Sequence, residues 1–190
     1  MTLVELVVVV AIFAVVSSIV IFNYGSFKSS VSLQNLSEDI ALSVRRAQAY
    51  AIGVQGSQVG GGTQFPGYGI HFDKTNSPKA FVLFADISGN KKYNNSSGCG
   101  ISNLSATNEC MEIVYIKSTD SITDICGDST CGKKSGDIMF LRPNPDAFFS
   151  VCPTSGACGS SYSSTKVEIT SQDGIKKIIT VWNTGQISIK

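Results

Sequence analysis

The amino-terminal part of the chain reads as one continuous helix that is too long for a domain to bury. Between positions 6 and 22 only two residues are polar, and an amphipathic pattern continues from there to a glycine stop signal at Gly53. A helix rises about 1.5 Å per residue, so residues 2–52 would span about 75–80 Å. Residues 54–190 cannot form a domain that wide. The first half of the helix must therefore project, into lipid or against other copies of the chain.

The predicted helix, residues 1–53, has two parts. Residues 1–25 form an apolar segment that can cross the hydrocarbon core of a membrane, which is about 30 Å thick. This segment lacks the basic start and the cleavage signals of a removable secretory signal, so we expect it to be retained. In residues 26–53, helical spacing draws one apolar stripe, made of Leu33, Leu36, Ile40, Val44, Ala47 and Ala51. We expect the stripe to pack on a sheet, and we expect a bend near Gly25, a poor helix former.

Residues 1–25 contain one charged side chain, that of Glu5. A charge at the centre of a bilayer costs about 2.5–3.5 kcal/mol on insertion scales, so this carboxylate needs a partner. The positive end of the helix dipole helps modestly. A free α-amino group at residue 1 can neutralise it, either within the chain or from a neighbouring chain whose helix is staggered alongside. In the second case only one stagger pairs both charges, and Glu5 sets the register of an assembly.

Residues 54–190 are rich in Gly, Ser, Asn and Thr and contain short runs typical of β-strands. The strands are predicted near 67–73, 80–87, 112–118, 137–142, 147–152, 166–171 and 176–190, the last divided by a turn. "QDGI" and "NTGQ" favour tight hairpins, and "GSQVGGGTQ" reads as the connection from the helix to the first strand. We predict an α+β fold in which the long helix packs on an antiparallel β-sheet domain.

Six cysteines lie in the second half of the chain, without a C-x-x-C spacing and with one histidine in the whole sequence. This pattern argues against zinc and haem sites and favours disulfides formed outside the cytoplasm, with free buried thiols as the alternative. Six cysteines allow fifteen pairings. We favour the sequential one because each bridge then closes a single loop: Cys99–Cys110, Cys126–Cys131 and Cys152–Cys158.

Metal and catalytic sites find little support in the sequence. Oxygen ligands with the spacing of a calcium loop occur at Asp86, Ser88, Asn90 and Asn94. The twelfth position of that loop is Ser97 instead of a bidentate acid, so we favour a solvated β-turn and expect no metal or cofactor. The chain's one histidine, His71, alternates with apolar neighbours and reads as a strand residue. We do not expect an enzyme.

Nucleic acid is weighed as a partner because of four basic doublets. They are Arg45–Arg46, Lys91–Lys92, Lys133–Lys134 and Lys176–Lys177. A stripe of them would bind DNA if the fold brought them together, but no aromatic residues are interleaved with them. With 15 basic and 14 acidic side chains, the chain as a whole gives no case for an anionic partner.

The opening "MTLVELVVVVAI" resembles the amino-terminal signature of type IV pilins and type II secretion pseudopilins, F-T-L-x-E-L-x-x-V-x-A-I. The matching positions are Thr2, Leu3, Glu5, Leu6, Val9, Ala11 and Ile12. A weaker similarity extends through residues 36–53, and beyond them the resemblance is architectural only. Two positions depart from the family: Met1 stands where Phe is usual, and Phe22 stands where many pilins have Pro.

The resemblance implies a type IV pilin-like fold and a role in assembly. It assigns Met1 as the residue left by prepilin peptidase and then N-methylated, although an initiator methionine remains the alternative. It also places Met1, Leu3, Glu5 and Leu6 at subunit contacts, with Glu5 beside the amino terminus of an adjacent subunit. The chain would sit in the cytoplasmic membrane, meet the pilus assembly machinery there, and then join an extracellular filament of identical copies.

Two other functions stay open. A minor pilin or an H-type pseudopilin of a secretion or DNA-uptake system would share every amino-terminal feature. Three loop disulfides and a Ser/Gly/Asn-rich surface favour the major subunit of an exposed fibre. A membrane-tethered binding domain, the second alternative, would gain nothing from a register-setting charge at Glu5.

Overall fold

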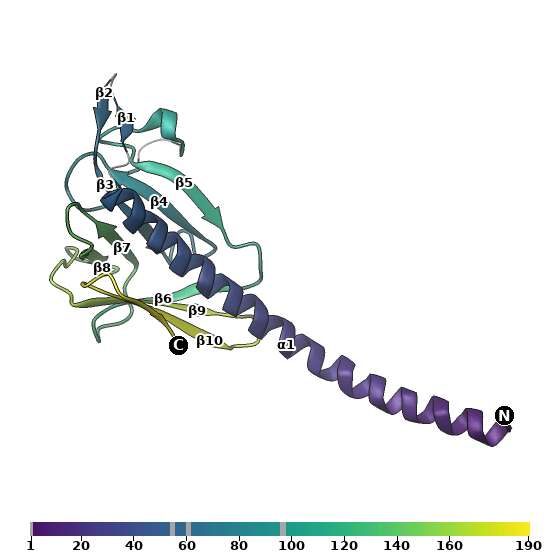
Figure 1. Ribbon diagram of the computed structural model, residues 1–190. Helices are drawn as coiled ribbons and strands as arrows, with labels where there is room; N and C mark the ends of the chain where they lie inside the picture. The colour runs from purple at the N-terminus through teal and green to yellow at the C-terminus, as the bar shows by residue number, and fades with distance from the viewer. Residues whose placement is uncertain (1, 54–55, 60–61, 96–97) are drawn as a thin grey trace.

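A single helix extends far beyond the domain on which it packs (Figure 1). The computed structural model describes residues 2–53, 56–59, 62–95 and 98–190. Helix α1, Leu3–Ile52, has 50 residues and continues through Gly25 without a break. At about 1.5 Å per residue it is about 75 Å long. Its amino half stands clear of the domain, and its carboxyl half lies across the strands (Figure 1).

The carboxyl half of α1 is held by the predicted apolar stripe. All six stripe residues are buried, and Leu33, Ile40, Val44 and Ala47 have no exposed surface. They face strands of two sheets, chiefly β3, β7 and β10, in one hydrophobic core. Burying each large aliphatic side chain contributes about 1.5–3 kcal/mol. The helix ends at Gly53 as predicted, where the glycine N–H bonds to the carbonyl of Ala49 at 2.8 Å.

The rest of the chain forms antiparallel sheets, which makes the fold α+β as predicted. A five-stranded sheet has the order β5-β4-β3-β7-β8, and a four-stranded sheet has the order β11-β10-β9-β6. The bounds in the first sheet are β3 Gly67–Asp73, β4 Ala80–Asp86, β5 Cys110–Tyr115, β7 Ser135–Phe140 and β8 Ala147–Cys152. Those in the second are β6 Ser121–Gly127, β9 Ser164–Thr170, β10 Lys176–Trp182 and β11 Ile187–Ile189.

Three details differ from the sequence prediction. The strands divide into two main sheets instead of one. Strand β6 was not predicted, because polar and small residues interrupt the apolar ones in "SITDICG". The segment read as a plain connection contains a small hairpin of β1, Ser57–Val59, and β2, Gly62–Gln64. The hairpins at "QDGI" and "NTGQ" are confirmed, with Gly174 and Gly185 both at φ 79°.

The two faces of the five-stranded sheet have different coverings. Tyr68, Ile70 and Phe72 of β3 point towards α1, and the ring of Tyr68 meets that of Tyr50 on the helix. The alternate residues point the other way, where the loop after β4 covers them. Tyr93 of that loop stacks on His71, with ring centroids 4.6 Å apart. The loop 87–95 therefore lies on the face opposite the helix.

Candidate functional site: the projecting helix and its first turn

The projecting half of α1 exposes large apolar side chains on every side. Exposed side chains among them include Leu3, Val4, Leu6, Val7, Val8, Val9, Val10, Ile12, Phe13, Val15, Val16, Ile19, Ile21, Tyr24 and Phe27. Its most apolar 18-residue stretch has a mean hydropathy of 2.9, and none of that stretch is buried within the chain. By length and composition the helix can cross a membrane. Soluble monomers rarely expose a contiguous apolar surface of this size, so the segment requires an apolar surrounding.

The first turn of α1 is closed by a reciprocal pair of hydrogen bonds. The Thr2 hydroxyl accepts from the Glu5 amide at 3.4 Å, and the Thr2 amide donates to the Glu5 carboxylate at 3.3 Å. This is a capping box, which satisfies two of the amides left without partners at a helix start. The sequence analysis missed it, although Thr-x-x-Glu before an apolar run is its usual signal. Glu5 thus has a partner in its own chain, held through two long and therefore weak bonds.

The other predicted assembly residues lie beside Glu5. Leu3 is 80% exposed and Leu6 is 54% exposed, so both side chains are available to a neighbour. Met1 lies outside the described residues, so its α-amino group, the partner expected for Glu5, is not placed. The first turn therefore presents one carboxylate on an otherwise apolar surface.

Where α1 leaves the domain, two serines one turn apart are held by two aspartates. Ser29 donates to Asp173 in the turn between β9 and β10. Ser32 donates to Asp120, before β6, at 2.7 Å, and Ser118 donates to the same carboxylate at 2.6 Å. Asp120 is fully buried. These contacts fix the helix at its exit from the domain. Each serine is far from its aspartate in the sequence, so no local motif predicts the contact.

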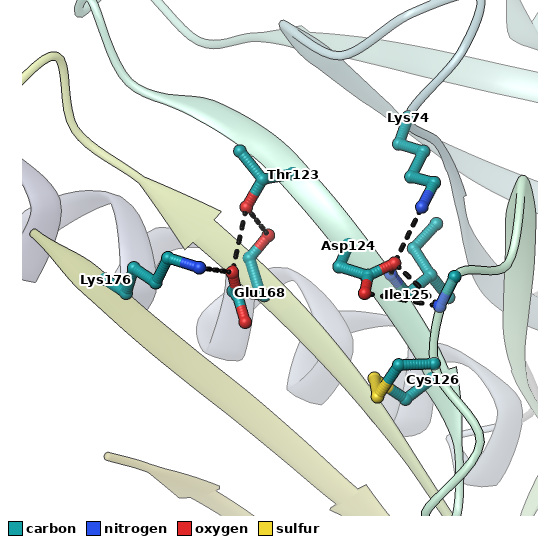
Figure 2. The surroundings of a disulfide bond; sticks show 9 residues. Lys74, Thr123, Asp124, Ile125, Cys126, Glu168 and Lys176 are labelled. Carbon is teal, nitrogen blue, oxygen red and sulfur yellow. Dashed lines mark hydrogen bonds and ion pairs between the residues drawn. A yellow bond between two sulfur atoms is a disulfide. The ribbon is translucent and has the colours of Figure 1, made fainter. Parts of the chain in front are cut away.

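The six cysteines form the three sequential bridges expected from the sequence. Figure 2 shows the surroundings of the bridge at the end of β6. There Asp124 accepts from the Lys74 ammonium at 2.7 Å and from the Gly132 amide at 3.0 Å. Burial pushes the pKa of Asp124 upwards, but the bonds from Lys74 and the backbone outweigh it and the pKa lies below its usual value. Asp124 also lies within 4.8 Å of both sulfurs of this bridge, yet bridged sulfurs offer no thiolate to a metal.

The loop considered for calcium is folded around two buried carboxylates. Asp86 accepts from the amides of Asn90 at 3.1 Å and Lys91 at 3.0 Å. Glu109, fully buried, accepts from the amides of Ser88 and Asn94, both at 2.9 Å. Burial raises the pKa of Glu109, and the nearby Asp86 adds to the rise. The backbone amides of Ser88, Asn90 and Asn94 are thus turned towards two buried acids, of which Glu109 was not considered in the sequence analysis.

Three of the charged residues weighed for catalysis and DNA binding have acidic partners. His71 lies in β3, and its Nδ1 is 2.5 Å from an oxygen of Asp137. Arg46 pairs with Glu112 at 2.8 Å, and Lys176 pairs with Glu168 at 2.8 Å (the second pair is drawn in Figure 2). These ion pairs reduce the positive charge of two of the four basic doublets.

Comparison of the chain with protein-family models, curated proteins and solved structures finds no match.

Proposed function

We propose that this chain is the structural subunit, or pilin, of an extracellular type IV pilus-like filament. The observation that carries the proposal is the projecting half of α1, which is apolar on all sides and wholly outside the domain. A helix with one apolar face can bury that face against one partner. A helix apolar all round must be surrounded, by lipid or by several like helices. Each large apolar side chain removed from water contributes about 1.5–3 kcal/mol, so exposure of this segment to water is strongly unfavourable.

In this proposal the segment serves twice. It first anchors the subunit in the cytoplasmic membrane, where prepilin peptidase and the pilus assembly machinery act. It then enters the core of the filament, where the helices of neighbouring copies replace lipid. The β-rich domain, closed by three disulfides, faces the outside, and its bridges suit an oxidising compartment.

Glu5 sets the register between copies. In the free subunit its carboxylate is held by the Thr2 amide at 3.3 Å, a long bond that a charged amine can displace or supplement. The α-amino group of an adjacent subunit would supply that charge. Other staggers would leave an acid and an ammonium unpaired among apolar side chains, which is strongly unfavourable.

Substitutions at Glu5 separate the charge from the helix cap. Glutamine also serves at this position of a capping box, so Glu5→Gln keeps the cap and removes the charge. We expect both Glu5→Gln and Glu5→Ala to abolish filaments, measured by electron microscopy of sheared cell surfaces. Glu38→Ala is the matched control, because Glu38 is an exposed acid on the domain-bearing half of the same helix.

Each outcome of that experiment has one meaning. Wild-type filaments in Glu5→Gln together with loss in Glu5→Ala would show that Glu5 acts only as a cap. Unchanged behaviour of both variants, with the protein present as a membrane-bound monomer, would favour a tethered binding domain. The amount of the chain in sheared filaments, measured by mass spectrometry, separates a major subunit from a minor pilin or pseudopilin.

A further inference from the structure

A hollow of about 320 Å³ lies on the face of the five-stranded sheet that α1 does not cover. It is bounded by the loop after β4, the outer edge of β8 and the segment that follows the last disulfide. The side chains and backbone that line it belong to Asn90, Lys91, Lys92, Phe148, Phe149, Ser150 and Ser160. A second hollow, of about 300 Å³, adjoins it and shares Phe148, Phe149 and Ser160.

Two cations without an acidic partner stand at this hollow. The Lys91 ammonium lies 4.3 Å from the ring centroid of Phe148, and within the described ranges neither Lys91 nor Lys92 forms an ion pair. The nearest acid along the loop, Asp86, is buried and accepts from loop amides. In contrast, Lys74 and Lys176 are both paired with carboxylates. Among the residues that line the hollow, two are lysines and none is acidic, so its lining carries a local positive charge.

A buried hydroxyl at the hollow also lacks a partner. Ser150 is 2% exposed, and among the residues that the structure describes its Oγ has no hydrogen-bond partner. Leaving a buried polar group unpaired costs about 1–3 kcal/mol, so a ligand oxygen that reached the Ser150 hydroxyl would remove that cost.

The backbone of β8 adds a donor at the same edge. The Ala147 amide bonds outwards to the Asn183 carbonyl at 2.7 Å, and the Val151 amide bonds outwards to the Gly159 carbonyl at 2.9 Å. Since amides alternate along an antiparallel strand, the Phe149 amide between them points to the same outer edge. The residues that line the hollow thus offer ammonium groups, a hydroxyl and an amide as donors, which suits an acceptor-rich anion.

We propose that this hollow binds a small ligand through an oxyanion, either a carboxylate or a phosphate. The two lysines supply the charge, Ser150 and the Phe149 amide donate hydrogen bonds, and the Phe148 ring packs on the carbon skeleton. The volume suits a ligand of about the size of an acidic monosaccharide, at the lower end of small-molecule pockets. The site lies on the domain, so it does not depend on filament assembly.

The test is an NMR titration of the full-length, isotope-labelled chain in neutral detergent at constant ionic strength. The probes are sodium glucuronate, inorganic phosphate and, as an uncharged comparison, glucose. We expect saturable shifts of the amide signals of Lys91, Lys92, Phe149 and Ser150 with at least one oxyanion and none with glucose. Saturation by glucuronate alone identifies an acidic sugar, and saturation by phosphate identifies a phosphate-bearing ligand.

Variants connect the binding to these residues. The double change Lys91→Gln and Lys92→Gln should weaken binding about tenfold, as loss of charged hydrogen bonds does. The matched doublet, Lys133→Gln and Lys134→Gln, should leave it unchanged. Ser150→Ala removes a hydroxyl that has no partner among the described residues, so the variant should fold normally and bind about threefold more weakly. Absence of saturable shifts with both oxyanions, equal binding of glucose, or equal loss in the control doublet would overturn the proposal.

Discussion

The two halves of α1 differ in hydrophobic content and have opposite relations to the rest of the chain. In the carboxyl half, apolar residues keep to one stripe, and Leu33, Ile40 and Val44 are wholly buried by the chain's own sheets. In the amino half, apolar residues cover the whole circumference, and no part of the chain that the structure describes covers them. The number of apolar residues and their arrangement around the helix together decide whether burial comes from within the molecule or from outside it.

The largest expected effect comes from a charge placed in the projecting half. Ile12 is 60% exposed and Leu42, in the other half, is 62% exposed, so the two are matched in the free subunit. We expect Ile12→Asp to abolish filaments and to weaken retention in the membrane, because the buried charge lacks a partner. Leu42→Asp should change the free energy of unfolding of the domain by less than about 0.5 kcal/mol. Filament yield and membrane fractionation measure the first effect, and thermal unfolding measures the second.

Wild-type filament yield and membrane retention in both Ile12→Asp and Leu42→Asp would contradict this difference between the two halves of α1. That result would mean that the projecting half remains in water in the working protein, and that its apolar surface has another purpose.

A core substitution in the domain-bearing half should have the reverse result. Ile40 has no exposed surface, so Ile40→Ala should lower the free energy of unfolding by about 2–5 kcal/mol through lost burial and a cavity. Membrane retention should stay at the wild-type level, since Ile40 lies outside the projecting part. Circular dichroism during heating in detergent gives the stability, and fractionation gives the retention. A parallel loss of both would show that the two halves of α1 do not act independently.

A smaller effect on the free energy of unfolding is expected from Asp124, a charged group of the domain. Asp124 has a pKa below its usual value because the bonds from Lys74 and the backbone outweigh the effect of burial. A lowered folded-state pKa means that the ionised group stabilises the fold above its unfolded pKa of about 3.9 and loses that contribution as pH falls further. Asp124→Asn should therefore cost about 1–2 kcal/mol at pH 7.

The pH dependence distinguishes this charge effect from a packing effect. The difference in melting temperature between Asp124→Asn and the wild type should shrink as pH drops below about 4, because the wild-type carboxylate becomes protonated. A difference that stays constant down to acid pH would mean that the aspartate acts through shape alone.

Much of the fold could be predicted because its signals are local. The stripe from Leu33 to Ala51 follows from helical spacing, and the hairpin at Gly174 follows from a turn residue with positive φ. Strand β6 could not be predicted, since it is defined by pairing with β9 and not by its own apolar pattern.

The candidate site was predictable only in part. Glu5 stands out because a carboxylate in an apolar segment is rare, whereas its bond to Thr2 was overlooked despite a local signal. Asp120 and Glu109 carry no such signal, because they act on residues that only tertiary folding brings near. Physical reasoning on one sequence therefore finds periodic surfaces more readily than buried acids.

The central claim is that the projecting half of α1 is surrounded by other copies of itself in register. Electron cryomicroscopy of native filaments, with the helix traced to its first residue, tests it most directly. The account predicts residues 3–25 in the filament core and the Glu5 carboxylate within about 4 Å of a neighbouring chain's α-amino group, the reach of an ion pair. A helix on the outside of the filament, or Glu5 facing bulk water, would contradict it.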